Sequence, residues 1–240
     1  MGANYASQVA KQMPLIRDPE VLAYLSVLGD SLARLTDRND LEWHFAIVDS
    51  KEVNAFAIPG GYIYVNRGLI ERSKTMAQVA GVVGHEIGHV VKRHSIKQMQ
   101  KSQGANIGVT GLCILTRVCE NAGGLLDLAA GGVFAKFSRD DEAEADAEGV
   151  RLVVRAGIDP HGIPEMFRIL LDERKAAPGA MDEFFMSHPL EEDRITATNA
   201  LIASYAPERL KGLTNDSPRF QAFKARLASL PESKPAAKKK

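Results

Sequence analysis

Cysteine is nearly absent from this sequence, and charge of one sign is not in excess. The 240 residues include two cysteines, Cys113 and Cys119, which are too few for a disulfide framework or for a metal site built on thiolates. A single disulfide between them stays open, because its geometry depends on the local fold. The 30 Lys and Arg residues balance 30 Asp and Glu residues, so the net charge predicts no nucleic-acid partner and no bulk attraction to membranes.

Long hydrophobic segments are also missing. The opening Met1-Gly2-Ala3-Asn4 runs into polar sequence without the apolar segment of a signal peptide. We therefore expect either a cytoplasmic protein or one whose targeting segment has been removed. Residues 104–116 carry no charge, but this run is shorter than the ~20 residues that span a bilayer. For residues 104–135 we expect two short packed helices or a mobile flap, with a membrane-dipping segment as the alternative.

What is present is enough apolar sequence for a sizeable core, since hydrophobic residues make up 45% of the chain. Helical spacing, interrupted near Pro14, and a helix-opening proline predict helices over residues 5–36, 74–99, 138–156 and 190–205, and another after Pro164. Ser138 and Asp141 are spaced as a capping box at the start of the third. Alternation predicts a strand at 41–49 and a hairpin of 53–58 with 62–65. These patterns indicate an α+β fold with a small sheet and a mostly helical second half.

The chemistry is concentrated in the run His-Glu-Ile-Gly-His from His85 to His89. Histidines four residues apart on a helix lie on one face about one turn apart, so both imidazoles reach the same ion. Glu86, about 100° round the helix from the first histidine, is placed to reach a water on that ion. This H-E-x-x-H pattern predicts that His85 and His89 bind zinc and that Glu86 is the catalytic base.

A catalytic zinc needs a third protein ligand. His94 lies five residues after the motif, which on an unbroken helix turns it ~140° away, so we expect a structural role for it. The acidic run 140–146 offers Glu142 and Asp146, which are four residues apart and share a helix face. Beside the motif we expect Glu142 to bind the metal and Asp146 to accept a hydrogen bond from a ligating histidine. Glu144 points elsewhere and is expected to be solvated, as acidic helices usually are.

These motifs together resemble the M48 family of zinc metallopeptidases over about residues 5–205. The resemblance rests on the H-E-x-x-H run continued to His94, on Phe137-Ser138-Arg139 with 142–146, on His188-Pro189 with Arg194, and on the hairpin 54–65. Because it lacks the transmembrane helices of the CAAX prenyl protease and HtpX branches, the chain is similar to the soluble, periplasmic BepA/LoiP-like branch. It departs from BepA in ending before any tetratricopeptide domain. The resemblance implies a zincin-like fold, with the hairpin at the sheet edge and the motif helix packed on the sheet.

The resemblance also implies roles for further residues. His188 is expected to stabilise the oxyanion or to occupy the fourth zinc position and keep the enzyme latent, unless it only caps a helix. Arg194 is expected to support the site, unless it is a surface arginine. The hairpin is expected to bind an extended peptide at the sheet edge, with its glycines allowing close approach or simply forming a tight turn. The expected substrate-binding residues are Phe56, Ala57, Gly60 and Gly61.

We therefore expect a zinc-dependent endopeptidase that binds one Zn²⁺ per chain and cleaves misfolded or envelope proteins in quality control. The alternative is a low-turnover, zinc-binding, chaperone-like module. Residues 1–212 are expected to form the peptidase domain, and 213–240 a C-terminal helix followed by a polar, basic tail. The resemblance implies a location in the periplasm, either free or tethered to the membrane through an N-terminal anchor, with the signal or lipoprotein segment removed.

Overall fold

The fold is described by a computed structural model for residues 2–104, 136–176, 187–189 and 192–233. The expectations for residues 105–135, including Cys113 and Cys119, and for the basic tail lie outside these residues. The strands are β1 (His44–Val48), β2 (Ala55–Ile58) and β3 (Tyr62–Asn66). The helices are α1 (Gly2–Gln12), α2 (Pro19–Ala33), α3 (Arg67–Arg72), α4 (Met76–Val91), α5 (His94–Gly104), α8 (Arg139–Arg155), α9 (Gly162–Ala176), α11 (Glu192–Ala203), α12 (Pro207–Leu210) and α13 (Pro218–Ser229).

The three strands form one mixed sheet in the order β1-β3-β2, which confirms the expected α+β class and its small sheet. β1 runs parallel to β3, and β2 pairs antiparallel with β3 as the predicted hairpin. Among the described strands β2 pairs with β3 alone, so it lies at an edge of the sheet. The second half of the described chain is helical, again as predicted.

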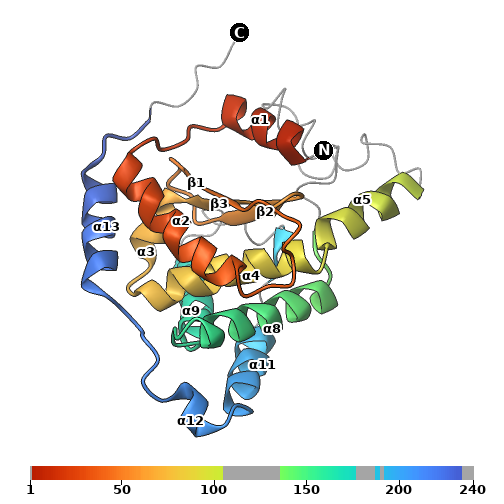
Figure 1. Ribbon diagram of the computed structural model, residues 1–240, viewed down its shortest axis with the longest axis vertical. Helices are drawn as coiled ribbons and strands as arrows, with labels where there is room; N and C mark the ends of the chain where they lie inside the picture. Colours follow the sequence, from red (N-terminus) through yellow and green to blue (C-terminus); the bar gives the residue numbers. More distant parts are fainter. Residues whose placement is uncertain (1, 105–135, 177–186, 190–191, 234–240) are drawn as a thin grey trace.

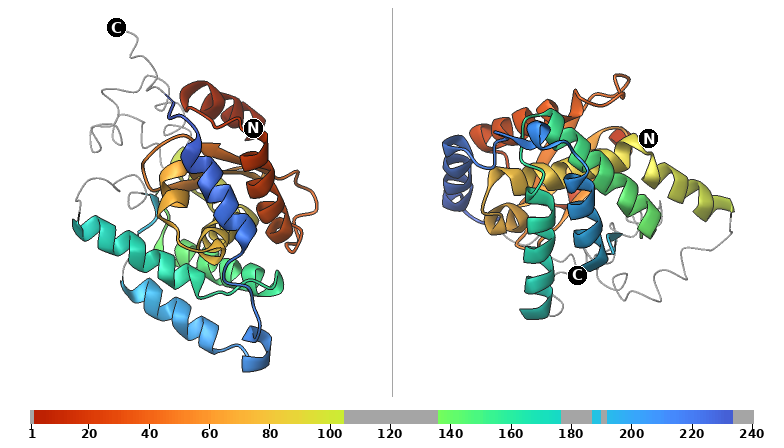
Figure 2. Two further views of the ribbon diagram at one scale, coloured as in Figure 1. Left: turned by 90° about the vertical axis from the view of Figure 1, so that its left-hand side faces the viewer. Right: turned by 90° about the horizontal axis from the view of Figure 1, so that it is seen from below.

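The sheet lies between α1 on one face and α4 on the other, with α8, α9 and α11 below α4 (Figure 1). Two further views show the same layering, with α13 packed along one side (Figure 2). Successive side chains of β2 point to opposite faces of the sheet, so they pack alternately against the two layers. Phe56 and Ile58 join the small cluster with Val9 under α1, whereas Ala55 and Ala57 belong to the main core.

Local sequence accounts for where several helices begin. Asp18 caps α2 by accepting from the Val21 N–H, with proline at the first helical position. Ser138 caps α8, and its hydroxyl and the Asp141 carboxylate each accept from the other residue's backbone N–H. The predicted capping box is therefore confirmed, and it places the acidic run on the first turns of α8.

The predicted single helix over 74–99 is wrong. α4 ends at Val91, Arg93 takes a left-handed backbone conformation with φ 59°, and a new helix begins at His94. The apolar stripe on which the prediction rests stops at Val91, and the polar residues beyond it favour a helix without fixing its direction. α5 consequently points away from the body of the molecule (Figure 1).

α4 and α8 approach each other closely because glycines lie at their contact. A β-carbon on Gly88 would stand 2.9 Å from the Ala145 carbonyl oxygen, and one on Gly149 would stand 3.1 Å from the His85 backbone nitrogen. Ordinary side chains at these positions would separate the helices. The close contact brings the acidic start of α8 beside the H-E-x-x-H motif.

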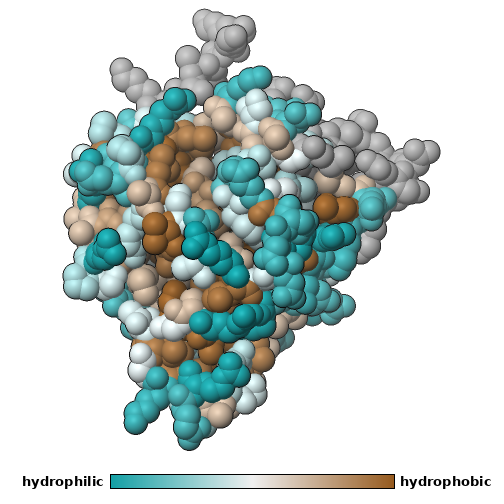
Figure 3. Space-filling model, viewed as in Figure 1, coloured by the Kyte–Doolittle hydropathy of each residue, from teal (hydrophilic) through white to brown (hydrophobic). Residues whose placement is uncertain are grey.

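The C-terminal helix α13 packs on α2 and α3 and adds Phe220, Phe223 and Leu227 to the main core. The Arg67 guanidinium, 3% exposed, pairs with Asp49 at 2.8 Å and donates to carbonyl groups at the end of α13. The face seen in Figure 3 exposes apolar side chains along and below α2, which carries the 69%-exposed Val27, among hydrophilic ones. None of the helices described here is both long and apolar enough to cross a membrane.

Candidate metal centre

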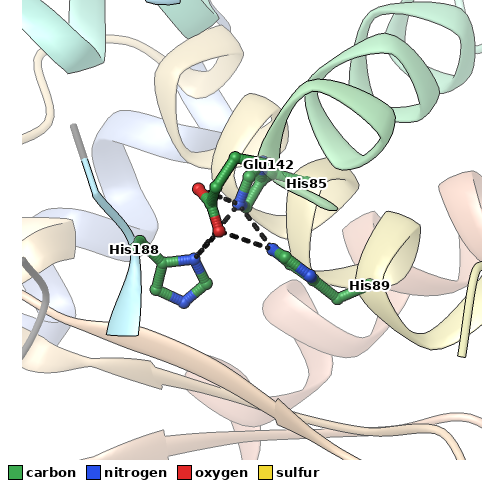
Figure 4. A group of neighbouring side chains, drawn as sticks. All are labelled: His85, His89, Glu142 and His188. Atoms are coloured by element: carbon green, nitrogen blue, oxygen red, sulfur yellow. Dashed lines mark hydrogen bonds and ion pairs between the residues drawn. The ribbon is translucent and has the colours of Figure 1, made fainter. Parts of the chain in front are cut away.

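Three elements converge on a buried group of nitrogen and oxygen donors. α4 supplies His85 and His89, α8 supplies Glu142, and the segment 187–189 supplies His188, with all four side chains turned toward one another (Figure 4). One donor atom from each lies within 4.8 Å of the others. All four residues are at most 4% exposed. Among the residues that the structure describes, this is the group of His, Cys, Asp and Glu suited to a metal.

The spacing of the donors fits a small tetrahedral ion. Ligands at 2.0–2.1 Å in a tetrahedron stand about 3.3–3.4 Å apart. The two Nε2 atoms of His85 and His89 are 3.0 Å apart, and His89 Nε2 lies 3.4 Å from Glu142 Oε1. His188 Nδ1 lies 3.0 Å from Glu142 Oε1 and 3.4 Å from His85 Nε2. The residues therefore fit a divalent metal with nitrogen and oxygen ligands.

The ionisation states of His89 and Glu142 suit the same role. Burial holds the pKa of His89 well below its usual value, so its imidazole is neutral and keeps a lone pair for a metal. Burial alone would raise the pKa of Glu142, but the charge and hydrogen bond of His188 outweigh it and lower this pKa well below normal. Burial would lower the pKa of His188, but the carboxylates of Glu142 and Glu86 raise it overall, so a metal that binds this ring would displace a proton.

Glu86 lies next to this group and outside it. Its carboxylate is 1% exposed, and neither oxygen has a hydrogen-bond partner among the described residues. His188 Nε2 is 3.7 Å from Glu86 Oε1, beyond hydrogen-bond length. Burial raises the pKa of Glu86 despite the opposing charges of His188 and His85. A buried carboxylate with a raised pKa and unused oxygens is suited to taking up a proton.

A second layer of contacts orients the donors. Asp146 Oδ1 lies 2.8 Å from His85 Nδ1, the nitrogen facing away from the donor group. Arg194 is not a surface residue: its guanidinium contacts Asp146 at 2.8 Å and Glu142 at 2.5 Å. It also donates to the Pro189 carbonyl at 3.0 Å, next to the donor histidine of that segment. Arg194 thus ties α8, α11 and the His188 segment together.

Two side chains around His89 carry no expected role in the metal site from the sequence. Phe137 stacks on the His89 ring with centroids 4.0 Å apart, and His94 Nδ1 lies 2.9 Å from His89 Nδ1. The expected 140° rotation of His94 assumed an unbroken helix, and the left-handed Arg93 removes that premise. His94 does not belong to the donor group, but it contacts His89, which does. Lys92 and Arg93 are good helix formers, so no local signal in the sequence indicates this break.

The four expected substrate-binding residues lie in different environments. Phe56 is buried and stacks on Tyr64, while Ala57 faces the opposite layer, so the edge of β2 offers its backbone rather than these side chains. A β-carbon on Gly61 would stand 2.6 Å from the Glu42 carbonyl oxygen, which accounts for that glycine as part of a tight turn. Gly60 lines a cleft that extends to His89 at the end of α4.

A helix bearing H-E-x-x-H, backed by a sheet and facing a glutamate on a second helix, defines a metallopeptidase. The chain belongs to peptidase family M48, whose family model matches residues 19–202. Membership implies a metal cofactor, for which the donor group described above is the candidate site. The resemblance inferred from the sequence motifs is therefore confirmed.

Named relatives agree with this assignment. The chain is 31% identical to the beta-barrel assembly-enhancing protease of Escherichia coli K12 over 204 residues, 81% of this chain and 42% of that protein. It is 29% identical to the mitochondrial metalloendopeptidase OMA1 of Schizosaccharomyces pombe, covering 84% of this chain and 59% of the relative. It is also 29% identical to the metalloprotease YcaL of E. coli K12, covering 77% and 74%. The chain thus spans less than half the length of the first of these relatives.

Proposed function

We propose that this protein is a zinc endopeptidase that hydrolyses polypeptides, with Zn²⁺ held by His85, His89 and Glu142. The observation that carries the proposal is the buried donor group with its tetrahedral spacing, next to the Glu86 carboxylate. Two imidazoles, a carboxylate and one further position make up the ligand set of catalytic zinc. The packing of α4 against both the sheet and α8 supports a zincin-like fold.

In this proposal zinc supplies Lewis-acid chemistry, polarising a carbonyl oxygen and lowering the pKa of water. Glu86 accepts the proton of the attacking water and passes it to the leaving amine, a role that suits its raised pKa. Asp146 and Arg194 hold the His85 ring and the Glu142 carboxylate in place through the contacts already described.

We propose further that His188 takes the fourth donor position in the conformation described here. Its Nδ1 is 3.0–3.4 Å from the Glu142 and His85 donor atoms, which supports this role over that of an oxyanion donor. A protein ligand in the fourth position leaves none open for substrate, so this conformation corresponds to a latent enzyme. Replacing His188 with Ala should then increase cleavage, whereas an oxyanion donor would make the same variant slower.

The edge of β2 supports a polypeptide substrate. An extended peptide pairs with an exposed strand edge through main-chain hydrogen bonds, and β2 runs along α4, which carries the motif. We propose unfolded or misfolded envelope proteins as substrates and the periplasm or the membrane-associated envelope as the place of action. The name of the E. coli relative, which refers to β-barrel assembly, supports this location. Fractionation of cells expressing the native gene tests it, and a purely cytoplasmic protein would contradict it.

The activity is tested with Glu86→Gln, because glutamine keeps the size of the side chain and cannot accept the proton. The variant should bind zinc as the wild type does and should lose cleavage of an unfolded substrate such as casein. Glu208→Gln, at an exposed position of α12, is the matched control and should cleave normally. If the variant still cleaves at the wild-type rate, Glu86 is not the base.

The second candidate is a zinc-binding, chaperone-like module with little turnover. The placement of His188 among the donors favours it, because a filled fourth position suppresses hydrolysis. This candidate predicts that neither the wild type nor His188→Ala cleaves casein, while both suppress aggregation of a misfolded client. Cleavage by either protein that disappears on Glu86→Gln favours the peptidase.

A further inference from the structure

Each ring of the two motif histidines has one nitrogen in the donor group and one outside it. His89 places Nε2 in the group, 3.0 Å from His85 Nε2 and 3.4 Å from Glu142 Oε1. Its Nδ1 faces His94 Nδ1 at 2.9 Å, a full hydrogen-bond length. His85 has the same arrangement with a different partner, since its Nδ1 contacts Asp146 at 2.8 Å.

Metal binding through Nε2 decides where the hydrogens of this pair lie. A ligating nitrogen offers its lone pair, so the neutral His89 ring carries its hydrogen on Nδ1. That N–H then donates to His94 Nδ1, which must be the unprotonated nitrogen of its own ring. The His94 hydrogen is left on Nε2, where Glu144 Oε2 at 3.4 Å and Asp141 Oδ1 at 3.5 Å are the acceptors. One chain of polar contacts therefore runs from the donor group to carboxylates on α8.

The backbone break between α4 and α5 makes this contact. Lys92 ends α4, the left-handed Arg93 redirects the chain, and His94 opens α5 with its side chain completely buried. A non-glycine residue in the left-handed region costs roughly 1 kcal/mol, so the turn is maintained by its surroundings.

We infer that His94 is a positioning residue for the metal site, accepting the Nδ1 hydrogen of His89 and so fixing the tautomer and orientation of that ligand. The inference rests on the proposed function in so far as His89 must be a metal ligand. It assigns to His94 the function that Asp146 performs for His85. The hydrogen-bond acceptor is thus an imidazole for one ligating histidine, His89, and a carboxylate for the other, His85.

The test compares His94→Asn with His94→Leu. The two side chains have nearly the same shape, and the asparagine Oδ1 occupies the place of the imidazole Nδ1, whereas leucine has no acceptor. His94→Leu should weaken zinc affinity by about 10–100-fold, as the loss of such partners does, and His94→Asn should restore most of it. Affinity is measured by competition with a chelator of known zinc affinity. Thermal melting of the metal-free proteins checks that both variants fold.

Equal affinity of both variants and the wild type would overturn the inference, and so would equal losses in both, which would mean that only the shape of the ring matters. If His94→Leu does not fold, histidine ¹⁵N–¹H spectra of the zinc-loaded wild type decide. They should show hydrogen on His89 Nδ1 and none on His94 Nδ1; hydrogen on His94 Nδ1 would refute the proposal. A wild type that binds zinc but shows no Glu86-dependent cleavage would contradict the peptidase proposal and leave this inference standing.

Discussion

Replacing Gly88 with alanine should disturb the metal site without touching any ligand. The new β-carbon would lie 2.9 Å from the Ala145 carbonyl oxygen, 3.0 Å from Ala145 Cα and 3.2 Å from Glu148 Cβ. Comfortable carbon–carbon contacts are about 3.5–4.0 Å, so α8 must move by roughly 0.5–1 Å. Glu142 is three residues from Ala145 on the same helix face and would move with it.

The two effects on stability oppose each other. Alanine is better than glycine in a helix by about 1 kcal/mol, whereas overpacking costs about 1–3 kcal/mol. Gly88→Ala should therefore destabilise the metal-free protein by at most about 2 kcal/mol, or about 4–8 °C in melting temperature for a chain of this size. Zinc affinity should also fall, by about 10–100-fold, because a displaced Glu142 binds the metal poorly.

Gly84→Ala is the matched control on the same helix. Its β-carbon would approach Gly149 only to 3.3 Å, so a shift of a few tenths of an ångström accommodates it. This variant should keep wild-type zinc affinity and a melting temperature within a few degrees of wild type. The measurements are calorimetry of the metal-free proteins and zinc titration against a chelator. Wild-type zinc affinity in Gly88→Ala, or a larger loss in Gly84→Ala, would refute the idea that this contact positions the glutamate.

Three other outcomes follow from the same structure. Glu142→Gln should purify with little zinc, whereas Glu144→Gln, at a half-exposed position, should keep nearly all of it. The reverse order in metal analysis would mean that the ligand lies on the Glu144 face of α8 and that the assignment of Glu142 is wrong. Burial would raise the pKa of Asp49, but the hydrogen bonds from Ser233 and the ion pair with Arg67 lower it overall, so its ionised form contributes stability above about pH 4 that is lost as the pH falls further. Asp49→Asn should accordingly cost about 1–3 kcal/mol at pH 7 in urea unfolding, with the difference shrinking below pH 4; a pH-independent difference would contradict this reasoning. Arg93→Gly should be neutral or stabilise by up to about 1 kcal/mol, and Arg93→Ala should not, which denaturant titration of the pair decides.

The parts of the fold that local sequence determines could be predicted. The capping box at Ser138 and Asp141, the hairpin around Gly60 and Gly61, and the stripe that ends at Val91 each depend on neighbours in the chain. The histidine spacing of the motif is equally local, since the geometry of a helix alone brings both rings to one face. The small sheet with its hairpin and the helical second half follow from such patterns, whereas the parallel pairing of β1 with β3 does not.

Other features depend on tertiary packing and escaped the sequence. The distance from His89 to Glu142 is set by the packing of α4 on α8, whereas the sequence indicated only that Glu142 shares a helix face with Asp146. One left-handed residue, Arg93, redirected α5 and gave His94 a neighbour that helical rotation excludes. Phe137 reaches the His89 ring from the segment before α8, and no sequence spacing encodes that contact.

The three-way contact of Arg194 bears on how the metal is exchanged. Its guanidinium joins Glu142, Asp146 and the Pro189 carbonyl by contacts between protein atoms alone. If these residues bind the metal, the same contacts would hold the candidate ligands together without it, and little ordering entropy would oppose loading. Stripping the ion with a chelator should therefore leave a folded, reloadable apoprotein. The rate of loading in such a molecule would then depend on the access of the ion to the site rather than on assembly of the site.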